Sequence, residues 1–374
     1  MYICKLGVYV RYLLYMDLGL FLEMLEIDST SGRESGFADF LAERLLTPDC
    51  HVEKYDVGDG TKNLLFSWGK PEIVFCSHID TVPPYIPPVV DGEIIRGRGS
   101  CDAKGQVFAM YEACKILKAK GYDGFGLLLL AGEETGSFGA KSFRGQHPGA
   151  EWVIVGEPTD NCMTSASKGT KAFEVSFEGK AFHSGYPQYG LSAVDMFNDF
   201  MNALKSIVFP VDDVLGDTTW NIGKLSSDNP QNILSDRLTC RVYFRTTFES
   251  DEMVCNVMKN IAGEDARLRF GRRRVQDGSD IVGKDVAVWQ KCMIVNALGG
   301  DAPMRYETLE GFETKSVAFG SDAPQLTNFR RKILCGPGSI LVAHRPEEHI
   351  SLSDLEAAVE NYVHMYETLV NFRN

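Results

Sequence analysis

Continuous apolar runs alternate with helical patterns along the first 160 residues of the chain. Four runs predict strands, and their unbroken apolar character is expected of a sheet that is covered on both faces. The four runs are "NLLFSW", "EIVFCSHI", "FGLLLLAGEE" and "EWVIVGEP". Between the second and third runs, "AKGQVFAMYEACKILKAKGY" predicts a helix, because its apolar positions share one face and Gly121 stops it. This alternation predicts an α/β fold with a mostly parallel central sheet and helices on both faces.

The pattern changes between about residues 170 and 275. There "KAFEVSFEG" and "RLTCRVYFRTT" alternate apolar and polar positions, which is typical of strands with one open face. Two helical segments, "GLSAVDMFNDFMNALKSI" and "DEMVCNVMKNIAG", complete a series of strand, helix, two strands, helix and strand. The series predicts a small α+β sandwich of ferredoxin-like type. We therefore predict a discontinuous main domain over residues 16–168 and 276–374, and an inserted domain over residues 169–275.

The N-terminal segment "MYICKLGVYVRYLLYM" is apolar but too short to span a bilayer, and it lacks a clear small-residue cleavage site. From Met16 onward, "MDLGLFLEMLEIDSTSGRES" predicts the first amphipathic helix. We expect residues 1–15 to be an extension with no function of their own.

The composition, 44% apolar and 24% charged over 374 residues, is that of a soluble globular protein. The net charge of −13 argues against nucleic acid or an anionic membrane as the main partner, because no basic tract offsets it. Ten cysteines are scattered without a C-x-x-C pair, and most of them lie in apolar runs. This distribution favours reduced, buried thiols and a cytoplasmic location.

Acidic and histidine residues stand where the predicted strands end. Asp102 follows in the turn "GRGSCDAKG", and His344 ends the run "SILVAH". The full set is His78, Asp80, Asp102, Glu133, Glu134, Glu157 and His344. In doubly wound sheets, functional sites form at the carboxyl ends of the strands. Each residue alone has an ordinary explanation: a structural histidine, a solvated glutamate pair or a helix N-cap. Together they indicate bound cations, because burying so many carboxylates without cations would be very costly.

Histidine nitrogens and carboxylate oxygens without a thiolate cluster suit zinc, cobalt or manganese. Two divalent ions need one bridging carboxylate and further ligands on each ion. We predict this ligand set: His78 and Glu157 on one metal, Glu134 and His344 on the other, and Asp102 between them. Asp80 would hold the His78 imidazole in the correct tautomer. The remaining carboxylate, Glu133, would act as general base on a metal-bound water.

Five segments also carry a family resemblance, namely "SHIDTVP", "GRGSCDAKG", "AGEETGSFGAK", "GEPT" and "AHRPEE". They resemble the signatures of the dinuclear zinc hydrolases that include acetylornithine deacetylase, succinyl-diaminopimelate desuccinylase, aminoacylase and glutamate carboxypeptidase. The resemblance covers the chain from about residue 17 onward and implies the same ligands and catalytic base. It also implies a cis peptide bond between Asp102 and Ala103. A glutamate at position 157 is similar to the deacylases and carboxypeptidases, whereas an aspartate would be more like the aminopeptidases.

The same resemblance assigns roles within and near the inserted dimerisation or lid domain, which in relatives dimerises and lends residues to the partner's active site. "GKAFHSGYP" places His183 where an oxyanion is stabilised, and "NPQNILSD" places Asn232 in the matching polar role. "CRVYFRT" places Arg245 where a substrate carboxylate binds, and "FGSDAP" supplies Gly320 and Ser321 as substrate contacts. His183 has an alternative role as a cap of the following turn, and Arg245 as a strand-edge salt bridge.

A cysteine, Cys101, precedes Asp102 where relatives more often have a small or aliphatic residue. It either brings thiol sensitivity or simply packs.

The resemblance implies metal-dependent hydrolysis of the amide bond of an N-acyl-L-amino acid. The first expected substrates are N-acetyl- or N-succinyl-ornithine or citrulline, as in arginine biosynthesis. The alternatives are a succinyl-diaminopimelate desuccinylase, and a dipeptidase or carboxypeptidase. Two hypotheses from other classes are an inactive dimeric binding protein and an α/β binding protein without metal. The intact ligand set favours the enzyme.

Overall fold

The computed structural model describes residues 16–58, 60–261 and 293–371. These residues form two compact units. The first unit holds the described residues up to Ser165, the segment Arg305–Lys315 and the described residues from Ser321 onward. The second unit holds the described residues of Ala166–Met304, and the segment Ser316–Gly320.

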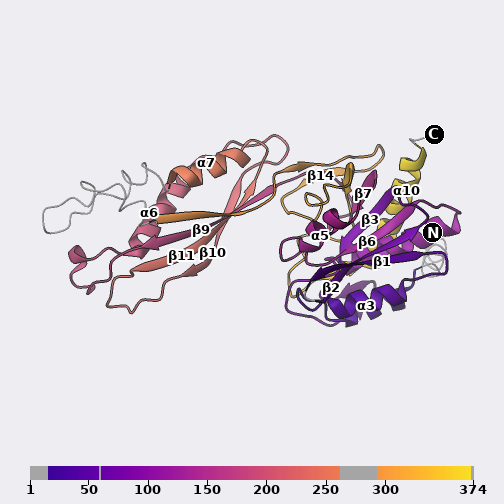
Figure 1. Ribbon diagram of the computed structural model, residues 1–374, viewed down its shortest axis with the longest axis horizontal. Helices are drawn as coiled ribbons and strands as arrows, with labels where there is room; N and C mark the ends of the chain where they lie inside the picture. Colours follow the sequence, from indigo (N-terminus) through magenta and orange to yellow (C-terminus); the bar gives the residue numbers. More distant parts are fainter. Residues whose placement is uncertain (1–15, 59, 262–292, 372–374) are drawn as a thin grey trace. The chain divides into compact units, whose positions relative to one another are not determined.

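A six-stranded sheet with the order β1-β2-β6-β3-β7-β15 forms the centre of the first unit (Figure 1). Its strands are β1 (His51–Gly58), β2 (Thr61–Trp68), β3 (Ile73–His78), β6 (Phe125–Leu130), β7 (Trp152–Val155) and β15 (Arg331–Leu334). The four strands β6, β3, β7 and β15 are parallel to one another, while β1 and β2 add an antiparallel edge. The predicted α/β fold with a mostly parallel sheet is confirmed.

The apolar runs predicted as strands supply both faces of this sheet. Every residue of β3 is buried, and alternate side chains point to opposite faces of the sheet. Ile73 and Phe75 belong to a large core cluster that includes residues of four helices, whereas Val74 and Cys76 do not. The four helices are α2 (Leu18–Glu26), α3 (Ser35–Arg44), α4 (Lys104–Ala119) and α10 (Leu352–Asn371).

A further helix of this unit, α5 (Phe138–Gln146), lies against the antiparallel edge of the sheet. Its buried residue Phe143 is not part of the large cluster. The Phe143 ring instead lies edge-on to Tyr55 of β1, with 5.1 Å between ring centroids.

The predicted helices α2 and α4 begin in different ways. Asp17 caps α2, since its side chain accepts a hydrogen bond of 3.0 Å from the backbone N–H of Leu20. Helix α4 follows directly after Asp102 and Ala103, and the predicted cis peptide bond between these two residues is present.

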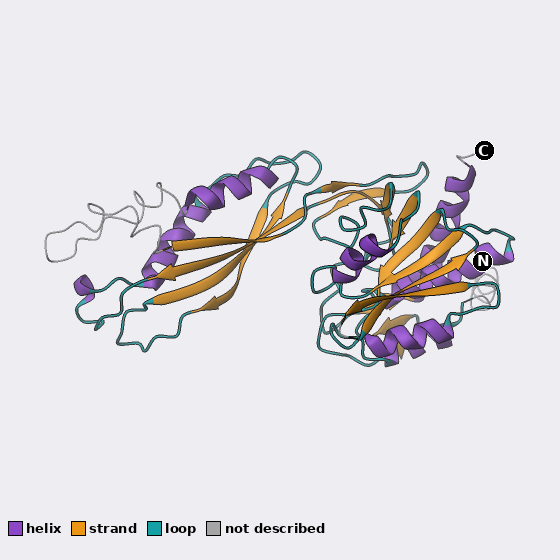
Figure 2. Ribbon diagram, in the orientation of Figure 1, coloured by secondary structure: helices purple, strands orange, loops and turns teal. Residues whose placement is uncertain are grey.

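A four-stranded antiparallel sheet with the order β10-β11-β9-β12 forms the second unit. Its elements are β9 (Gly169–Glu178), the 3-10 helix η1 (Pro187–Tyr189), α6 (Ala193–Lys205), β10 (Thr219–Ser226), β11 (Arg237–Thr246), α7 (Asp251–Ile261) and β12 (Met293–Gly299). Figure 2 shows α6 and α7 on one side of this sheet. The predicted ferredoxin-like series of strands and helices is therefore present.

The last strand of this sheet lies further along the chain than the sequence pattern indicates. It is β12, which pairs with β9 and starts at Met293, whereas the inserted domain was predicted to end at residue 275. Met293 and Val295 pack into the core of the second unit, and this tertiary contact is not visible in the local pattern. Residues 262–292 lie outside the described part of the chain, as do residues 1–15.

Two smaller sheets have the orders β13-β8-β14 and β16-β5-β4. Their strands are β4 (Val89–Asp91), β5 (Ile94–Arg96), β8 (Met163–Ser167), β13 (Met304–Arg305), β14 (Thr314–Val317) and β16 (His349–Ser351). Among the helices of the described residues, none combines the length and the apolar character needed to cross a membrane.

Candidate metal centre

Three neighbouring parallel strands bring their carboxyl ends to one edge of the central sheet. β3 ends at His78, β6 is followed by Glu133 and Glu134, and β7 is followed by Glu157. Backbone hydrogen bonds continue past the strand ends. The Ile79 N–H donates to the carbonyl of Leu130 in β6, and the Gly156 N–H donates to the carbonyl of Cys76 in β3, each at 2.8 Å. The predicted convergence of these side chains at one edge follows from the parallel order of the strands.

His78 is buried and contacts acceptors with both ring nitrogens. Its Nδ1 lies 2.9 Å from the backbone carbonyl oxygen of Asp80, which can only accept, so Nδ1 carries the proton. Its Nε2 lies 3.0 Å from Oδ1 of Asp102. Burial would lower the pKa of His78, but hydrogen bonds to Asp102 and Asp80 outweigh burial and raise that pKa well above its usual value. In the neutral ring with its proton on Nδ1, Nε2 keeps a lone pair, so Nε2 and Oδ1 of Asp102 could both bind one cation.

The other oxygen of Asp102 faces a second histidine. His344 Nε2 lies 3.2 Å from Oδ2 of Asp102 and 2.9 Å from Oε1 of Glu134. These hydrogen bonds to Asp102 and Glu134 raise the pKa of His344 to about 10. The two oxygens of Asp102 are thus directed at two different histidines, as a bridging carboxylate requires.

Within the described part of the chain, the possible ligand atoms form three compact groups, and within each group they lie within 4.8 Å of one another. The groups are His78, Asp102 and Glu157; Asp102, Glu134 and His344; and His78, Glu133 and Glu134. The first two share Asp102 and contain the same residues as the two ligand sets that the sequence predicts. The side chain of His344 is 47% exposed, whereas that of His78 is 1% exposed, so the second group is more open to solvent than the first.

The electrostatic state of the carboxylates also fits bound cations. Burial, together with neighbouring carboxylates, raises the pKa values of Glu133 and Glu157 well above their usual range. Burial would raise the pKa of Asp102 as well, but hydrogen bonds from His344 and His78 lower it. Divalent cations would stabilise the ionised form of all these groups at once. The donor set of imidazole and carboxylate therefore fits two such ions, and zinc suits it.

Asp80 contacts both His78 and the backbone that carries Glu133 and Glu134. Its carboxylate is fully buried, and Oδ1 accepts from the backbone N–H of Glu133 at 3.0 Å. Oδ2 accepts from the N–H of Glu134 at 3.2 Å and from Ser31 Oγ at 2.9 Å. The backbone carbonyl of Asp80, rather than its carboxylate at 3.5 Å, is the nearer partner of His78. The carboxylate thus holds the Glu133–Glu134 backbone in place in addition to its contact with His78.

His344 reaches the site from a turn, although "SILVAH" was predicted as a strand. Residues 339–344 contain one isolated bridge, between Ser339 and Thr159, followed by turns. His344 has a φ of +61°, in the left-handed region. The apolar run does not form a strand here, because its Leu341 is 75% exposed and is not part of a sheet core.

Asp322, which lies two positions from Gly320 and directly after Ser321, was not among the predicted site residues. Asp322 and Ser321 are both buried. Burial, with nearby Asp80, raises the pKa of Asp322 to about 7. A signal was available, since an aspartate surrounded by small and apolar residues in "AFGSDAP" is unusual for a solvated loop.

Of the two roles open to Cys101, thiol sensitivity and packing, the structure favours packing. Its side chain is buried, and Sγ donates to the carbonyl of Ser339 at 3.4 Å. Burial raises the pKa of this thiol well above its usual value, so it is a poor nucleophile.

Of the other residues assigned by resemblance, His183, Asn232, Arg245 and Gly320 lie in the second unit, whereas Ser321 lies in the first. His183 Nδ1 accepts from the N–H of Gly185 at 3.0 Å, and the neighbouring Ser184 N–H donates to the carbonyl of Asn232 at 2.9 Å. The Arg245 guanidinium lies over the Tyr243 ring, 5.1 Å from its centroid. A Cβ atom at Gly320 would lie 3.9 Å from this guanidinium. The structure thus brings His183 near Asn232, and Arg245 near Gly320.

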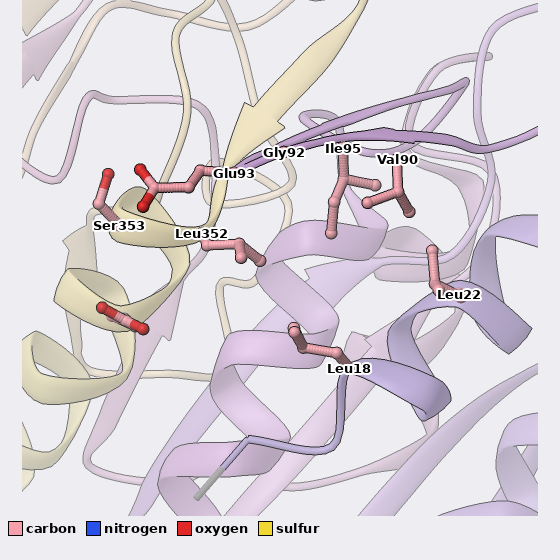
Figure 3. A pocket seen from close by; sticks show the side chains of 9 residues that line it. Leu18, Leu22, Val90, Gly92, Glu93, Ile95, Leu352 and Ser353 are labelled. Carbon is pink, nitrogen blue, oxygen red and sulfur yellow. The ribbon is translucent and has the colours of Figure 1, made fainter. Parts of the chain in front are cut away.

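A cavity of about 360 Å³ lies elsewhere in the first unit (Figure 3). It is lined by Leu18, Leu22, Val90, Gly92, Glu93, Ile95, Leu352, Ser353 and Glu356. None of these residues belongs to the three candidate ligand groups. The cavity is therefore separate from the candidate metal centre.

Sequence comparison now places the fold and the site in a known class. The pattern of peptidase family M20/M25/M40 matches residues 74–368. A peptidase M20 domain-containing protein of Schizosaccharomyces pombe is 32% identical over 363 residues, covering 93% of this chain and 83% of that protein. A probable carboxypeptidase of Aspergillus niger is 30% identical over 389 residues, covering 93% of this chain and 88% of that protein.

Solved structures share the fold. A tripeptidase from Staphylococcus aureus superposes with a TM-score of 0.74 at 20% identity, over 92% of this chain and 96% of that chain. A Bacillus subtilis protein described as a dinuclear metal-binding peptidase gives a TM-score of 0.64 at 13% identity, over 97% of this chain and 99% of that chain. The fold and the candidate site define a metal-dependent hydrolase. The chain belongs to peptidase family M20/M25/M40.

Proposed function

We propose that this chain uses two divalent metal ions to hydrolyse the amide bond of an N-acyl-L-amino acid. Zinc is the first candidate for these ions, and cobalt or manganese are the alternatives. The observation that carries the proposal is the position of Asp102, whose two oxygens lie 3.0 Å and 3.2 Å from His78 and His344. Two ions would be held by these three residues together with Glu157 and Glu134. When bound, they would polarise the acyl carbonyl and lower the pKa of water.

The chain's own groups move the proton. Glu133 belongs to a compact group with His78 and Glu134, and its burial raises its pKa, which suits a general base near neutral pH. Glu133 accepts a proton from the attacking water and returns it to the leaving amine. Asp80 keeps Glu133 in position by accepting its backbone N–H.

His183 stabilises the oxyanion that forms on the acyl carbon. Its Nδ1 accepts a hydrogen bond from Gly185, so a neutral ring carries its proton on Nε2 and can donate it. The turn-capping contact and the catalytic role are therefore compatible. Resemblance suggests that His183 acts in the site of a partner subunit, and we propose a homodimer that forms through the second unit.

Recognition of the substrate carboxylate is assigned to Arg245, whose guanidinium fork suits a planar carboxylate. Asn232, Gly320 and Ser321 complete the proposed contacts. The first substrates to test are N-acetyl- and N-succinyl-ornithine and -citrulline, which would place the reaction in arginine biosynthesis. We also propose a cytoplasmic location, which the scattered cysteines favour.

A second candidate function is cleavage of a peptide next to a free C-terminal carboxylate. The observation that favours it is the similarity to relatives named as probable carboxypeptidases, at 30% identity over nine-tenths of this chain. A dipeptide or a peptide with a free C-terminus presents the same carboxylate as an N-acyl amino acid. Succinyl-diaminopimelate is an alternative substrate for the first candidate function, because it is also an N-acyl amino acid.

The experiment measures amine release by the zinc- or cobalt-loaded protein. The panel holds N-acetyl and N-succinyl derivatives of ornithine, citrulline and diaminopimelate, together with dipeptides and C-terminally extended peptides. Turnover of one acyl amino acid supports the first function, and turnover of peptides alone supports the second. A protein that binds two metal ions and cleaves no amide would contradict both and favour the inactive binding protein.

A further inference from the structure

One buried carboxylate outside the candidate ligand groups contacts the loop that carries Asp102. Glu348 is 1% exposed, and a single oxygen, Oε1, accepts three backbone N–H groups. The donors are Gly99 at 2.9 Å, Cys101 at 3.0 Å and Asp102 itself at 3.0 Å. Three converging donors on one carboxylate oxygen fix the course of the backbone through Asp102.

The second oxygen of Glu348 pairs with the guanidinium of Arg98, which is 2% exposed. Arg98 also donates to the carbonyl oxygens of Pro84, at 3.3 Å, and Arg345, at 3.4 Å. The charge of Glu348 is thus compensated inside the protein. Glu348 and Arg98 each also form hydrogen bonds with several backbone groups. A buried pair of this kind persists only when its geometry and its other hydrogen bonds are satisfied.

Glu348 lies on the same short segment as His344. Four positions separate the two residues, and the Glu348 N–H donates to the carbonyl of Arg345 at 3.2 Å. Directly after Glu348, β16 pairs with β5, the strand that leads into the Asp102 loop. The segment that carries His344 is therefore fastened to the segment that carries Asp102 by a strand pair and by the Glu348 side chain.

We propose that Glu348 is a positioning residue that holds Asp102 and His344 in register, so that both offer ligand atoms to one metal ion. This inference rests on the proposed two-metal centre and deepens it. Both oxygens of Glu348 are occupied by protein donors, so Glu348 acts through the Asp102 loop and not as a ligand. Ligands have to be held to within about 0.5 Å of their working geometry, and groups that orient ligands commonly contribute 10- to 100-fold to metal affinity.

The test compares Glu348→Gln with Glu347→Gln. The amide keeps the shape of the side chain but presents an NH₂ group to Arg98 or to the backbone donors. Glu347 is the matched control, because it is the adjacent glutamate and its side chain is 67% exposed. Zinc affinity is measured by competition with a chelator, and the visible absorption bands of the cobalt-loaded protein report ligand geometry. We expect roughly 10- to 100-fold weaker zinc binding and shifted cobalt bands for Glu348→Gln only.

A further variant separates positioning from general stability. Arg98→Lys keeps a positive charge beside Glu348 and leaves the three backbone contacts of Oε1 intact. It should lower the unfolding temperature while metal affinity and cobalt bands stay close to those of the wild-type protein. Glu348→Gln with wild-type zinc affinity and unchanged cobalt bands would overturn the positioning role.

If Glu348→Gln fails to fold, Glu348→Asp takes its place, since it keeps the charge but is one methylene too short to reach the same three donors. Unchanged metal binding in Glu348→Asp would equally overturn the inference. A wild-type protein that binds fewer than two ions would instead refute the proposed metal centre.

Discussion

The carboxylates at the candidate site divide by what their oxygens contact. Asp102 and Glu134 face histidine nitrogens at about hydrogen-bonding distance, whereas Asp80 faces backbone N–H groups. Within the described residues, the Glu133 carboxylate makes neither kind of contact. Its backbone N–H, in contrast, donates to Asp80. A carboxylate that is placed but not engaged is the one best suited to exchange a proton.

Replacing Glu133 by Gln should therefore lower kcat by a factor of roughly 100 or more, because the amide cannot accept the proton of the attacking water. The zinc content should stay at two ions per chain, as determined by elemental analysis of the dialysed protein. Glu134→Gln is the matched comparison, and it should lose metal as well as activity. A Glu133→Gln protein that has lost one ion would make Glu133 a ligand, in line with its group with His78 and Glu134.

Asp80→Asn should lower the free energy of unfolding by about 1–3 kcal/mol, because a buried NH₂ group would then face a backbone N–H that now has an acceptor. Urea unfolding monitored by fluorescence measures the change. Ser31→Ala serves as the comparison, since it removes a single contact to Oδ2 at 2.9 Å and should cost less. Equal stability of Asp80→Asn and the wild-type protein would argue against the backbone-holding role.

At the scale of elements, the strand ends explain why His78, Glu133, Glu134 and Glu157 converge, but the junction before α4 has its own constraint. Gly105 lies in the first turn of α4, next to the Asp102 loop, and a Cβ atom there would lie 2.4 Å from the carbonyl oxygen of Ser100. The close approach of helix and loop therefore requires a residue without a side chain.

Gly105→Ala should destabilise the protein by about 1–3 kcal/mol, because the loop or the helix has to shift to accommodate the methyl group. Gly145→Ala in α5 provides the control, since no atom lies within 4 Å of a Cβ placed there. That substitution should leave stability unchanged or raise it by up to about 1 kcal/mol. Thermal unfolding of both variants decides the matter, and a loss of stability of the same size in each would contradict the steric explanation.

At the scale of the whole molecule, the buried carboxylates link metal binding to folding. Glu133, Glu157 and Asp322 all have pKa values that burial raises, which means that their ionised forms are destabilised in the metal-free fold. Cations that bind the folded chain remove this cost and stabilise it by mass action.

Removal of metal by a chelator should therefore abolish amide hydrolysis and lower the unfolding temperature, and restored zinc should reverse both effects. At a free zinc concentration of 100 times the Kd, each site adds about 2.7 kcal/mol to the free energy of unfolding. Calorimetry of the chelated and zinc-loaded protein provides the measurement. An unfolding temperature that does not depend on zinc would argue against a metal centre in this chain.

Much of the fold follows from local patterns. Unbroken apolar runs predicted β2, β3, β6 and β7, and the alternating runs predicted β9 and β11 with their open face. Two features did not follow. The strand β12 was placed outside its domain, and "SILVAH" was predicted as a strand although it forms turns. In both cases a short apolar stretch is compatible with several structures, and only its tertiary neighbours decide which one forms.

By itself, the sequence determined the α/β class, the ferredoxin-like insertion and the list of residues that now form compact groups of possible ligands. These properties depend on periodicity and on residue type at strand ends, which are local. The tertiary structure alone decided that the two oxygens of Asp102 face different histidines, that Asp80 holds backbone N–H groups, and that Glu348 reaches the Asp102 loop from some 246 positions away. Such contacts depend on strand order and on packing between distant segments, and no local pattern encodes them.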